Sequence, residues 1–240
     1  MIEITIQIEE LISNNATDFE ISKVFKTYYK NYLDSIDTTV ETTGGKDFFI
    51  KHTKHTDKFL ILLYKYILRK NFASHQPMSS SIPISLVALG SYGREQLCIY
   101  SDIDIMLLYE NVKGYNLKNI MEEFITLAWD CGLKLGSRVH ELREISDAVK
   151  EDITIKSSIL ESRLIYGSKN LWFGYQNVLS KIRKTNQKEF VLDKLEEHKQ
   201  RLMKYPLKME PNIKDGYGGI RESNMMYWMA NILYAVTNTK

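Results

Sequence analysis

Asp102 and Asp104, with one residue between them, begin an apolar run and are the residues best placed to do chemistry. In a strand, residues i and i+2 point to the same side. Their Cα atoms would then lie roughly 6–7 Å apart, at a rise of about 3.3 Å per residue. Two carboxylates at that spacing suit Mg²⁺ or Mn²⁺, with substrate phosphates completing the shell of oxygen ligands. The pair therefore predicts a divalent-metal site.

A Gly-Ser turn upstream could bind the phosphates that such a metal accompanies. Gly90 and Ser91 end the preceding apolar run, and ten residues separate Ser91 from Asp102. Backbone N–H groups at the turn and the Ser91 hydroxyl can cradle a phosphate. Gly93 permits a further turn, and Arg94 can add a cation. The stretch is neither a Walker A loop nor G-x-G-x-x-G. A Gly-Ser turn alone is usually only a turn, and an Asp-x-Asp pair alone is usually a strand edge. The two together favour a site that binds a metal-nucleotide complex.

The elements around these residues are predicted as strands over 84–89, 103–109 and 134–141 and a helix over 117–131. In the third strand, Glu141 shares a face with Val139, whereas Lys134 and Arg138 share the other face. These two basic residues can either reach a triphosphate or form a solvated strand face.

Helices are expected on both sides of this strand-rich centre. Apolar spacing predicts helices over 18–33 and 57–72, with a loop over 36–45 and a linker over 73–81. Alternating isoleucines at 2–8 predict a short strand or an amphipathic lead-in. After Arg143 the chain is expected to be wholly helical, over 144–150, 153–166, 170–183, 187–204 and 221–236.

This order of elements predicts an α+β fold in which a small mixed β-sheet is flanked by helices and followed by a helical C-terminal region. The expected organisation is an N-terminal helical region over 1–80, a core over 81–150 and a helical region over 151–240 that packs on the core. A chain of 240 residues is long enough to bury such a core without disulfides or metals.

Composition narrows the class of protein. Lys and Arg number 32 against 30 Asp and Glu, a formal charge of +2, which argues against a dedicated nucleic-acid or membrane-surface binder. The first ten residues do not resemble a signal peptide. The apolar stretch over 59–68 is too short to span a bilayer. Cys98 and Cys131 form no CxxC motif and are expected as two thiols. We therefore expect a cytoplasmic protein.

The stretch from Leu89 to Ile105 resembles the DNA polymerase beta-like nucleotidyltransferase superfamily, whose pattern is a hydrophobic residue, Gly-Gly/Ser, a spacer and Asp-hydrophobic-Asp-hydrophobic. Further stretches resemble, more narrowly, the nucleotidyltransferase domain of the bifunctional PII uridylyltransferase/uridylyl-removing enzymes. They are Ala128–Gly136 leading to Val139, Glu151–Thr154 followed by Leu160–Gly167, and Pro211–Glu222. The likeness covers about residues 45–236.

The chain departs from that family at several positions. Ser91 stands where members usually have a second Gly, Tyr217 where they have Pro, Glu222 where they have Asp, and His140 where Arg is expected. The family continues into an HD phosphohydrolase domain and two ACT sensor domains, and this chain has no His-Asp dipeptide. We therefore expect a truncated or stand-alone transferase domain, without uridylyl removal or glutamine sensing.

The resemblance implies transfer of UMP from UTP to a tyrosine hydroxyl of a PII-type signal protein, with release of pyrophosphate and a role in nitrogen regulation. Asp102 and Asp104 would bind Mg²⁺ or Mn²⁺ and act in catalysis. Gly90, Ser91, Gly93 and Arg94 would bind the nucleotide. Superfamily members often add a third carboxylate from a neighbouring strand.

Glu141 is our candidate for that third carboxylate, and Asp152 is its rival.

Two other functions stay open. One is a nucleotidyltransferase with another acceptor or nucleotide. The other is a catalytically inactive nucleotide-binding regulatory domain.

Overall fold

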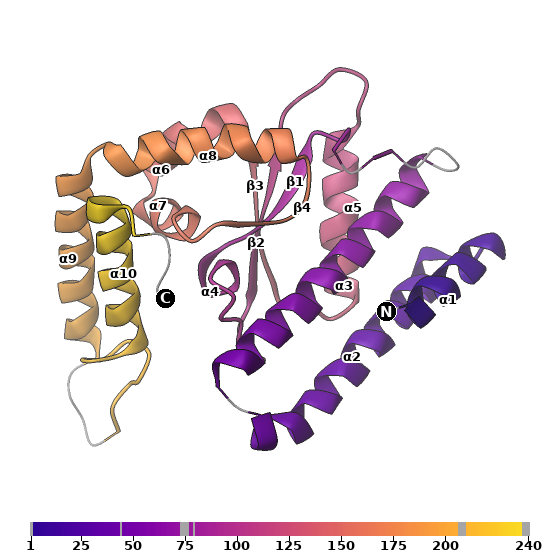
Figure 1. Cartoon of the computed structure of the whole chain (residues 1–240), viewed down its shortest axis with the longest axis horizontal. Helices are drawn as coiled ribbons and strands as arrows, with labels where there is room; N and C mark the ends of the chain where they lie inside the picture. Colours follow the sequence, from indigo (N-terminus) through magenta and orange to yellow (C-terminus); the bar gives the residue numbers. More distant parts are fainter. Residues whose placement is uncertain (1, 44, 73–76, 79, 206–209, 237–240) are drawn as a thin grey trace. The chain divides into compact units, whose positions relative to one another are not determined.

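The computed structural model describes residues 2–43, 45–72, 77–78, 80–205 and 210–236. The chain divides into two compact units (Figure 1). Unit 1 contains residues 1–142 and 162–172, and unit 2 contains residues 143–161 and 173–240. No helix among the described residues combines the length and apolar character needed to cross a membrane.

Unit 1 is built on a four-stranded sheet in the order β3-β2-β1-β4. Its strands are β1 (Ile84–Ala88), β2 (Ile103–Tyr109), β3 (Leu135–Glu141) and β4 (Arg163–Gly167). Strand β1 pairs antiparallel with both β2 and β4, whereas β2 and β3 are parallel. Helix α5 (Leu117–Asp130) connects the two parallel strands, as a crossover requires. The predicted mixed sheet with flanking helices is confirmed.

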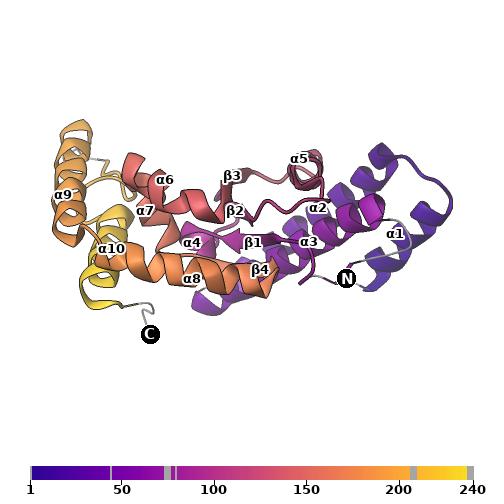
Figure 2. The same cartoon turned by 90° about the horizontal axis from the view of Figure 1, so that it is seen from above.

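The core of unit 1 joins this sheet to long helices. These are α1 (Ile2–Ser13), α2 (Asp18–Thr43), α3 (Lys46–Phe72) and α5, and α2 contacts each of the other three. Helices α1, α2 and α3 lie side by side in Figure 2. Alternate strand residues such as Leu86 and Ile105 are fully buried in one apolar cluster with Phe59 and Phe124 of the helices. Burial of this continuous apolar surface holds the sheet in place.

The strand predicted as one alternative for 2–8 and the loop predicted for 36–45 were wrong. Residues 2–8 lie in helix α1, where Ile4 and Ile8 are buried and Ile6 is 54% exposed. Isoleucines at every second position fit a strand, but those four positions apart, such as Ile4 and Ile8, also fit one face of a helix. Packing of α1 against α2 selects the helix. The expected loop at 36–45 is mostly helix, because α2 continues to Thr43, and Gly44 lies outside the described residues. Helix α3 begins at Lys46 rather than near Asp57.

The C-terminal half is not wholly helical, which corrects the prediction for 153–166. That range contains helix α7 (Ile153–Ile159) and then strand β4. A short apolar run fits either a helix or a strand. Here the residues pair with β1 and therefore form a strand. Gly167 ends the strand with a φ of 111°, and a Cβ at this position would overlap the backbone of Ile84. The position therefore requires glycine.

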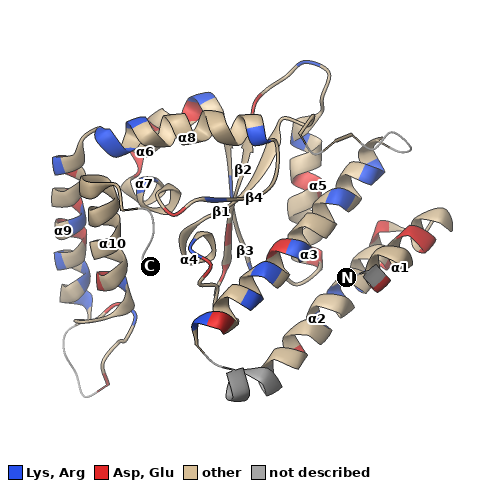
Figure 3. Ribbon diagram, in the orientation of Figure 1, with Lys and Arg blue, Asp and Glu red and all other residues tan. Residues whose placement is uncertain are grey.

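The described residues of unit 2 are mainly helical, as expected. It contains α6 (Ile145–Glu151), α7, most of α8 (Lys169–Lys184), α9 (Gln187–Lys204) and α10 (Ile220–Tyr234), with a 3₁₀ turn at Leu142–Glu144 beside its start. Helices α9 and α10 pack together, and Gln187 Nε2 donates to the Ile232 carbonyl. Acidic and basic residues are interspersed along α9 (Figure 3).

One sequence prediction concerns residues that are only partly described. The expected linker at 73–81 includes residues 73–76 and 79, which lie outside the described residues, as do residues 206–209 after α9. Cys98 is exposed, Cys131 is buried, and both are free thiols, as expected.

Candidate active site

The Gly-Ser turn lies beside the start of the carboxylate-bearing strand. Strand β1 ends at Ala88, and the Leu89 N–H then donates to the carbonyl of Asp104 at 2.9 Å. The chain turns at once into α4 (Gly90–Gly93), a single helical turn, with Gly90 at a φ of 56°. This left-handed conformation favours glycine. Antiparallel pairing of β1 with β2 thus brings together two motifs that the sequence separates.

Asp102 and Asp104 are both exposed, while Ile103 and Ile105 between and after them are buried. Asp102 directly precedes β2, and Asp104 is its second residue. This alternation places both carboxylates on one side and anchors the strand through the other.

A glycine on β3 makes room for Asp104. Gly136 lies directly opposite Asp104 in the parallel register, and a Cβ at Gly136 would overlap the carboxylate Oδ1. Gly136 was not among the predicted site residues. The sequence did contain a signal for it, because a glycine inside a strand often marks a position where another group approaches closely.

Glu141 does not join the pair. It pairs with Tyr109 at the far end of β2, five residues beyond Gly136 along β3. Five residues correspond to roughly 16 Å and to the opposite face of the sheet. Glu141 is also 6% exposed, in contrast to the two exposed aspartates.

The rival, Asp152, caps α7 through its Oδ1, which accepts from the Thr154 N–H at 2.6 Å. Among the described residues there is no group of three or more His, Cys, Asp or Glu side chains that could hold a metal ion. A cation here would have Asp102 and Asp104 as protein ligands. Phosphate and water oxygens would complete its shell, an arrangement that Mg²⁺ accepts.

The turn itself is closed by backbone hydrogen bonds. Gly93 N–H donates to the Leu89 carbonyl at 2.9 Å, and Arg94 N–H donates to the Gly90 carbonyl at 3.1 Å. Ser91, Gly93 and Arg94 are partly exposed, and Arg94 Nε donates to Gln96 Oε1 at 3.1 Å. The first amides of such a turn have no acceptor within it, so they suit an anion.

A basic residue on β3 shares the face of the carboxylates. Arg138 lies opposite Met106, which places it on the Asp104 side of the sheet, two residues beyond Gly136. A cation in that place could contact a triphosphate.

Behind the turn, three side chains from distant segments form a buried cluster. Tyr92 in α4 is fully buried, and its hydroxyl donates to Asp57 Oδ1 at 2.6 Å. Arg163 at the start of β4 binds both Asp57 oxygens, at 2.8 and 3.0 Å. Burial, followed by the charge of Asp57, raises the pKa of Tyr92 well above its usual value, so its hydroxyl remains a donor. This cluster was not predicted from the sequence.

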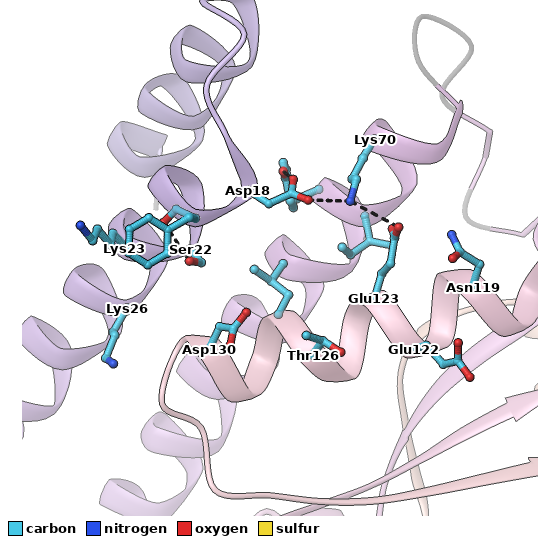
Figure 4. A pocket seen from close by; sticks show the side chains of 14 residues that line it. Asp18, Ser22, Lys23, Lys26, Lys70, Asn119, Glu122, Glu123, Thr126 and Asp130 are labelled. Carbon is cyan, nitrogen blue, oxygen red and sulfur yellow. Dashed lines mark hydrogen bonds and ion pairs between the residues drawn. The ribbon is translucent and has the colours of Figure 1, made fainter.

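A small cavity adjoins the start of β2. Its volume is about 260 Å³, and Ser101 and Ile103, the two neighbours of Asp102, line it. Lys134 and the exposed Tyr100 line it as well. A second, larger cavity of about 710 Å³ lies between α2, α3 and α5 (Figure 4). None of the predicted site residues lines this larger cavity.

Comparison with known proteins points to one family. The family model described as GlnD PII-uridylyltransferase matches residues 189–240. A bifunctional uridylyltransferase/uridylyl-removing enzyme of Pseudomonas fluorescens is 34% identical over 165 residues, covering 68% of this chain and 18% of that protein. The enzyme of the same name from Nitrosococcus oceani is 36% identical over 150 residues, covering 61% of this chain and 17% of that protein.

The chain is related to the PII uridylyltransferases. The resemblance inferred from its motifs is therefore confirmed, and the related proteins are transferases by name. The chain spans slightly less than a fifth of the length of these curated relatives. The similarity thus concerns one part of a much longer type of protein.

Proposed function

We propose that this chain is a Mg²⁺-dependent nucleotidyltransferase that transfers UMP from UTP to a tyrosine hydroxyl of a PII-type signal protein. The names of its relatives support the reaction. One structural observation carries most weight, namely that the Leu89–Asp104 hydrogen bond sets the Gly90–Ser91 turn beside the exposed aspartate pair. A phosphate cradle next to two carboxylates suits a metal-bound triphosphate.

In this proposal, each side chain binds or orients a reactant. Asp102 and Asp104 hold the cation, the turn amides and the Ser91 hydroxyl bind phosphate oxygens, and Arg94 adds positive charge. A bound Mg²⁺ supplies Lewis-acid stabilisation of the phosphoryl oxygens. The acceptor oxygen forms its bond to the α-phosphorus as the bond to pyrophosphate breaks. The acceptor tyrosine, with a pKa near 10 in water, gives up its proton to solvent water in the process.

The first test is calorimetric titration with UTP, CTP, ATP and GTP, each with and without Mg²⁺. We expect Mg²⁺-dependent binding with a preference for UTP. Transfer is then measured as label from α-labelled UTP appearing on a PII-type protein, with a variant of that protein lacking the acceptor tyrosine as control. Binding without any preference for UTP would contradict the uridylyl assignment, and no binding by the folded chain would contradict the whole proposal.

A second candidate is a domain that binds nucleotide without catalysis. The observation in its favour is that the described residues provide two carboxylates at the strand end and no group of three. Release of pyrophosphate separates the two candidates, because a regulatory domain would bind UTP and release none. With either function we propose a cytoplasmic location, where nucleoside triphosphates and free thiols occur.

A further inference from the structure

The Gly90–Gly93 turn is held at its centre by one residue, Tyr92. The side chain of Tyr92 points away from the partly exposed residues on either side of it and is fully buried. Its hydroxyl donates to Asp57 of α3, a residue 35 positions earlier in the chain. Its carbonyl accepts from Arg163 Nη2 at 3.4 Å, from a residue 71 positions later. Both polar ends of Tyr92 are therefore bound by the same Asp57–Arg163 pair.

That pair is well suited to act as a rigid support. The Arg163 guanidinium makes two hydrogen bonds to the Asp57 carboxylate, and this contact fixes the orientation of both planar groups. The guanidinium also lies over the Tyr92 ring, 5.5 Å from its centroid. Burial disfavours the charged guanidinium, but the Asp57 bond and charge outweigh burial and raise the pKa of Arg163. The guanidinium of Arg163 thus remains charged throughout the physiological pH range.

The turn needs such support because its backbone is unusual. Gly90 begins it at a φ of 56°, and Glu95 follows it at a φ of 60°, a conformation that non-glycine residues rarely adopt. Conformations of this kind persist where the surrounding structure holds them in place. An ion pair is also a poor choice for stability alone, since apolar side chains of similar volume often stabilise a core as well.

We propose that Asp57 and Arg163 are positioning residues that act through Tyr92 to hold the Gly90–Gly93 turn in its phosphate-binding conformation. This inference rests on the proposed function for the identity of the bound group. It assigns a role to the Leu160–Gly167 stretch, which the reaction itself does not use. Neither residue contacts the reacting atoms in this assignment.

The test compares two tyrosine-to-phenylalanine variants. Tyr92→Phe removes the hydrogen bond to Asp57 and keeps the ring. Tyr66→Phe is a matched control, because Tyr66 is buried in the same unit and its hydroxyl donates to Asp18 at 2.8 Å, outside the turn cluster. Titration of each variant with Mg²⁺-UTP should show affinity roughly tenfold weaker for Tyr92→Phe, the size expected when a bond to a charged group is lost. Tyr66→Phe should bind as the unmodified chain does.

A second measurement follows the turn without any ligand. Amide hydrogen exchange at Gly93 and Arg94, whose N–H groups close the turn, should be faster in Tyr92→Phe and unchanged in Tyr66→Phe. If the unmodified chain binds no nucleotide, the proposed function fails while exchange still decides the positioning role. Unchanged exchange and affinity in a folded Tyr92→Phe would overturn the inference. Arg163→Lys, which keeps the charge without the two-point contact, should shift exchange in the same direction.

Discussion

Two regions of unit 1 each contain a buried tyrosine that donates to an ion-paired aspartate, but the ion pair lies in a different place in each region. The groove between α2, α3 and α5 has a buried tyrosine, Tyr66, that donates to Asp18, and Lys70 Nζ contacts both Asp18 and Glu123 at 2.7 and 3.3 Å (Figure 4). The strand-end site has Tyr92 donating to Asp57, which Arg163 binds. In the groove the ion pairs line the cavity itself. At the strand end the ion pair lies behind the turn, and a different pair of carboxylates faces outward.

Neither of these two cavities is lined by the predicted site residues, so cavity size is not what places the proposed site. The groove is the larger hollow, at about 710 Å³ against about 260 Å³ beside β2. Lys70 in this groove already binds Asp18 and Glu123, and exposed ion pairs of this kind contribute little free energy. The strand end places two carboxylates on one side and supports the facing turn from beneath. Such division between exposed reactive groups and a buried support is typical of a pre-organised site.

The largest effect should follow from Asp104→Asn. This change keeps the side-chain shape but removes a negatively charged ligand, and a metal ion contributes several kcal/mol to charge stabilisation. Transfer of labelled UMP should fall roughly 1,000-fold, since each 1.36 kcal/mol is a factor of ten. Thermal unfolding should be nearly unchanged, because Asp104 is exposed. Normal turnover in this variant would show that the carboxylate pair is not the metal site.

Gly136→Ala should weaken transfer by roughly 10- to 100-fold, the range seen when a group that orients a metal ligand is changed. The added methyl would occupy the place of Asp104 Oδ1 and force the carboxylate to turn. Ser137→Ala is the control, because Ser137 follows in the same strand and points to the other face. Equal losses in both variants would indicate a general effect on β3.

Acid should destabilise the packing of helix α3, which carries His52 and His55. Burial lowers the pKa of His52 and of His55 to about 4, from 6.5. Both are therefore neutral when folded, and Tyr32 Oη lies 2.9 Å from His52 Nδ1. Between pH 6.5 and 4 the unfolded chain binds more protons, so the free energy of unfolding falls as the pH falls.

Denaturant unfolding at several pH values between 7 and 4 checks this prediction. A double variant, His52→Gln and His55→Gln, should lose most of the pH dependence in this window. A slope that persists in the double variant would assign the acid sensitivity to other groups.

The smallest effect should follow from Lys70→Met in the groove. The change removes contacts with Asp18 and Glu123, both of which are partly solvent-exposed. We expect a loss of about 1 kcal/mol or less in the free energy of unfolding. Nucleotide affinity and transfer should be unchanged in calorimetry and label-transfer assays. A large loss of transfer would indicate that the groove, rather than the strand end, contains the functional site.

The sequence by itself predicted the aspartate pair at the strand end and determined most of the elements that carry it. Strand β2 lies at 103–109 and helix α9 at 187–204, as their apolar spacing predicts. The alternation of Ile103 and Ile105 with the aspartates was enough to place both carboxylates on one side. These features depend on local periodicity, which a sequence shows directly.

Only the tertiary structure decided three other points. Residues 163–167 form a strand because β1 offers them an edge, although their apolar spacing also fits a helix. The register of β3 carries Glu141 to the far end of the sheet, and no single-strand pattern contains a register. The Asp57–Arg163 pair joins residues 106 positions apart. Such contacts arise from packing between whole elements, so spacing along the chain could not reveal them.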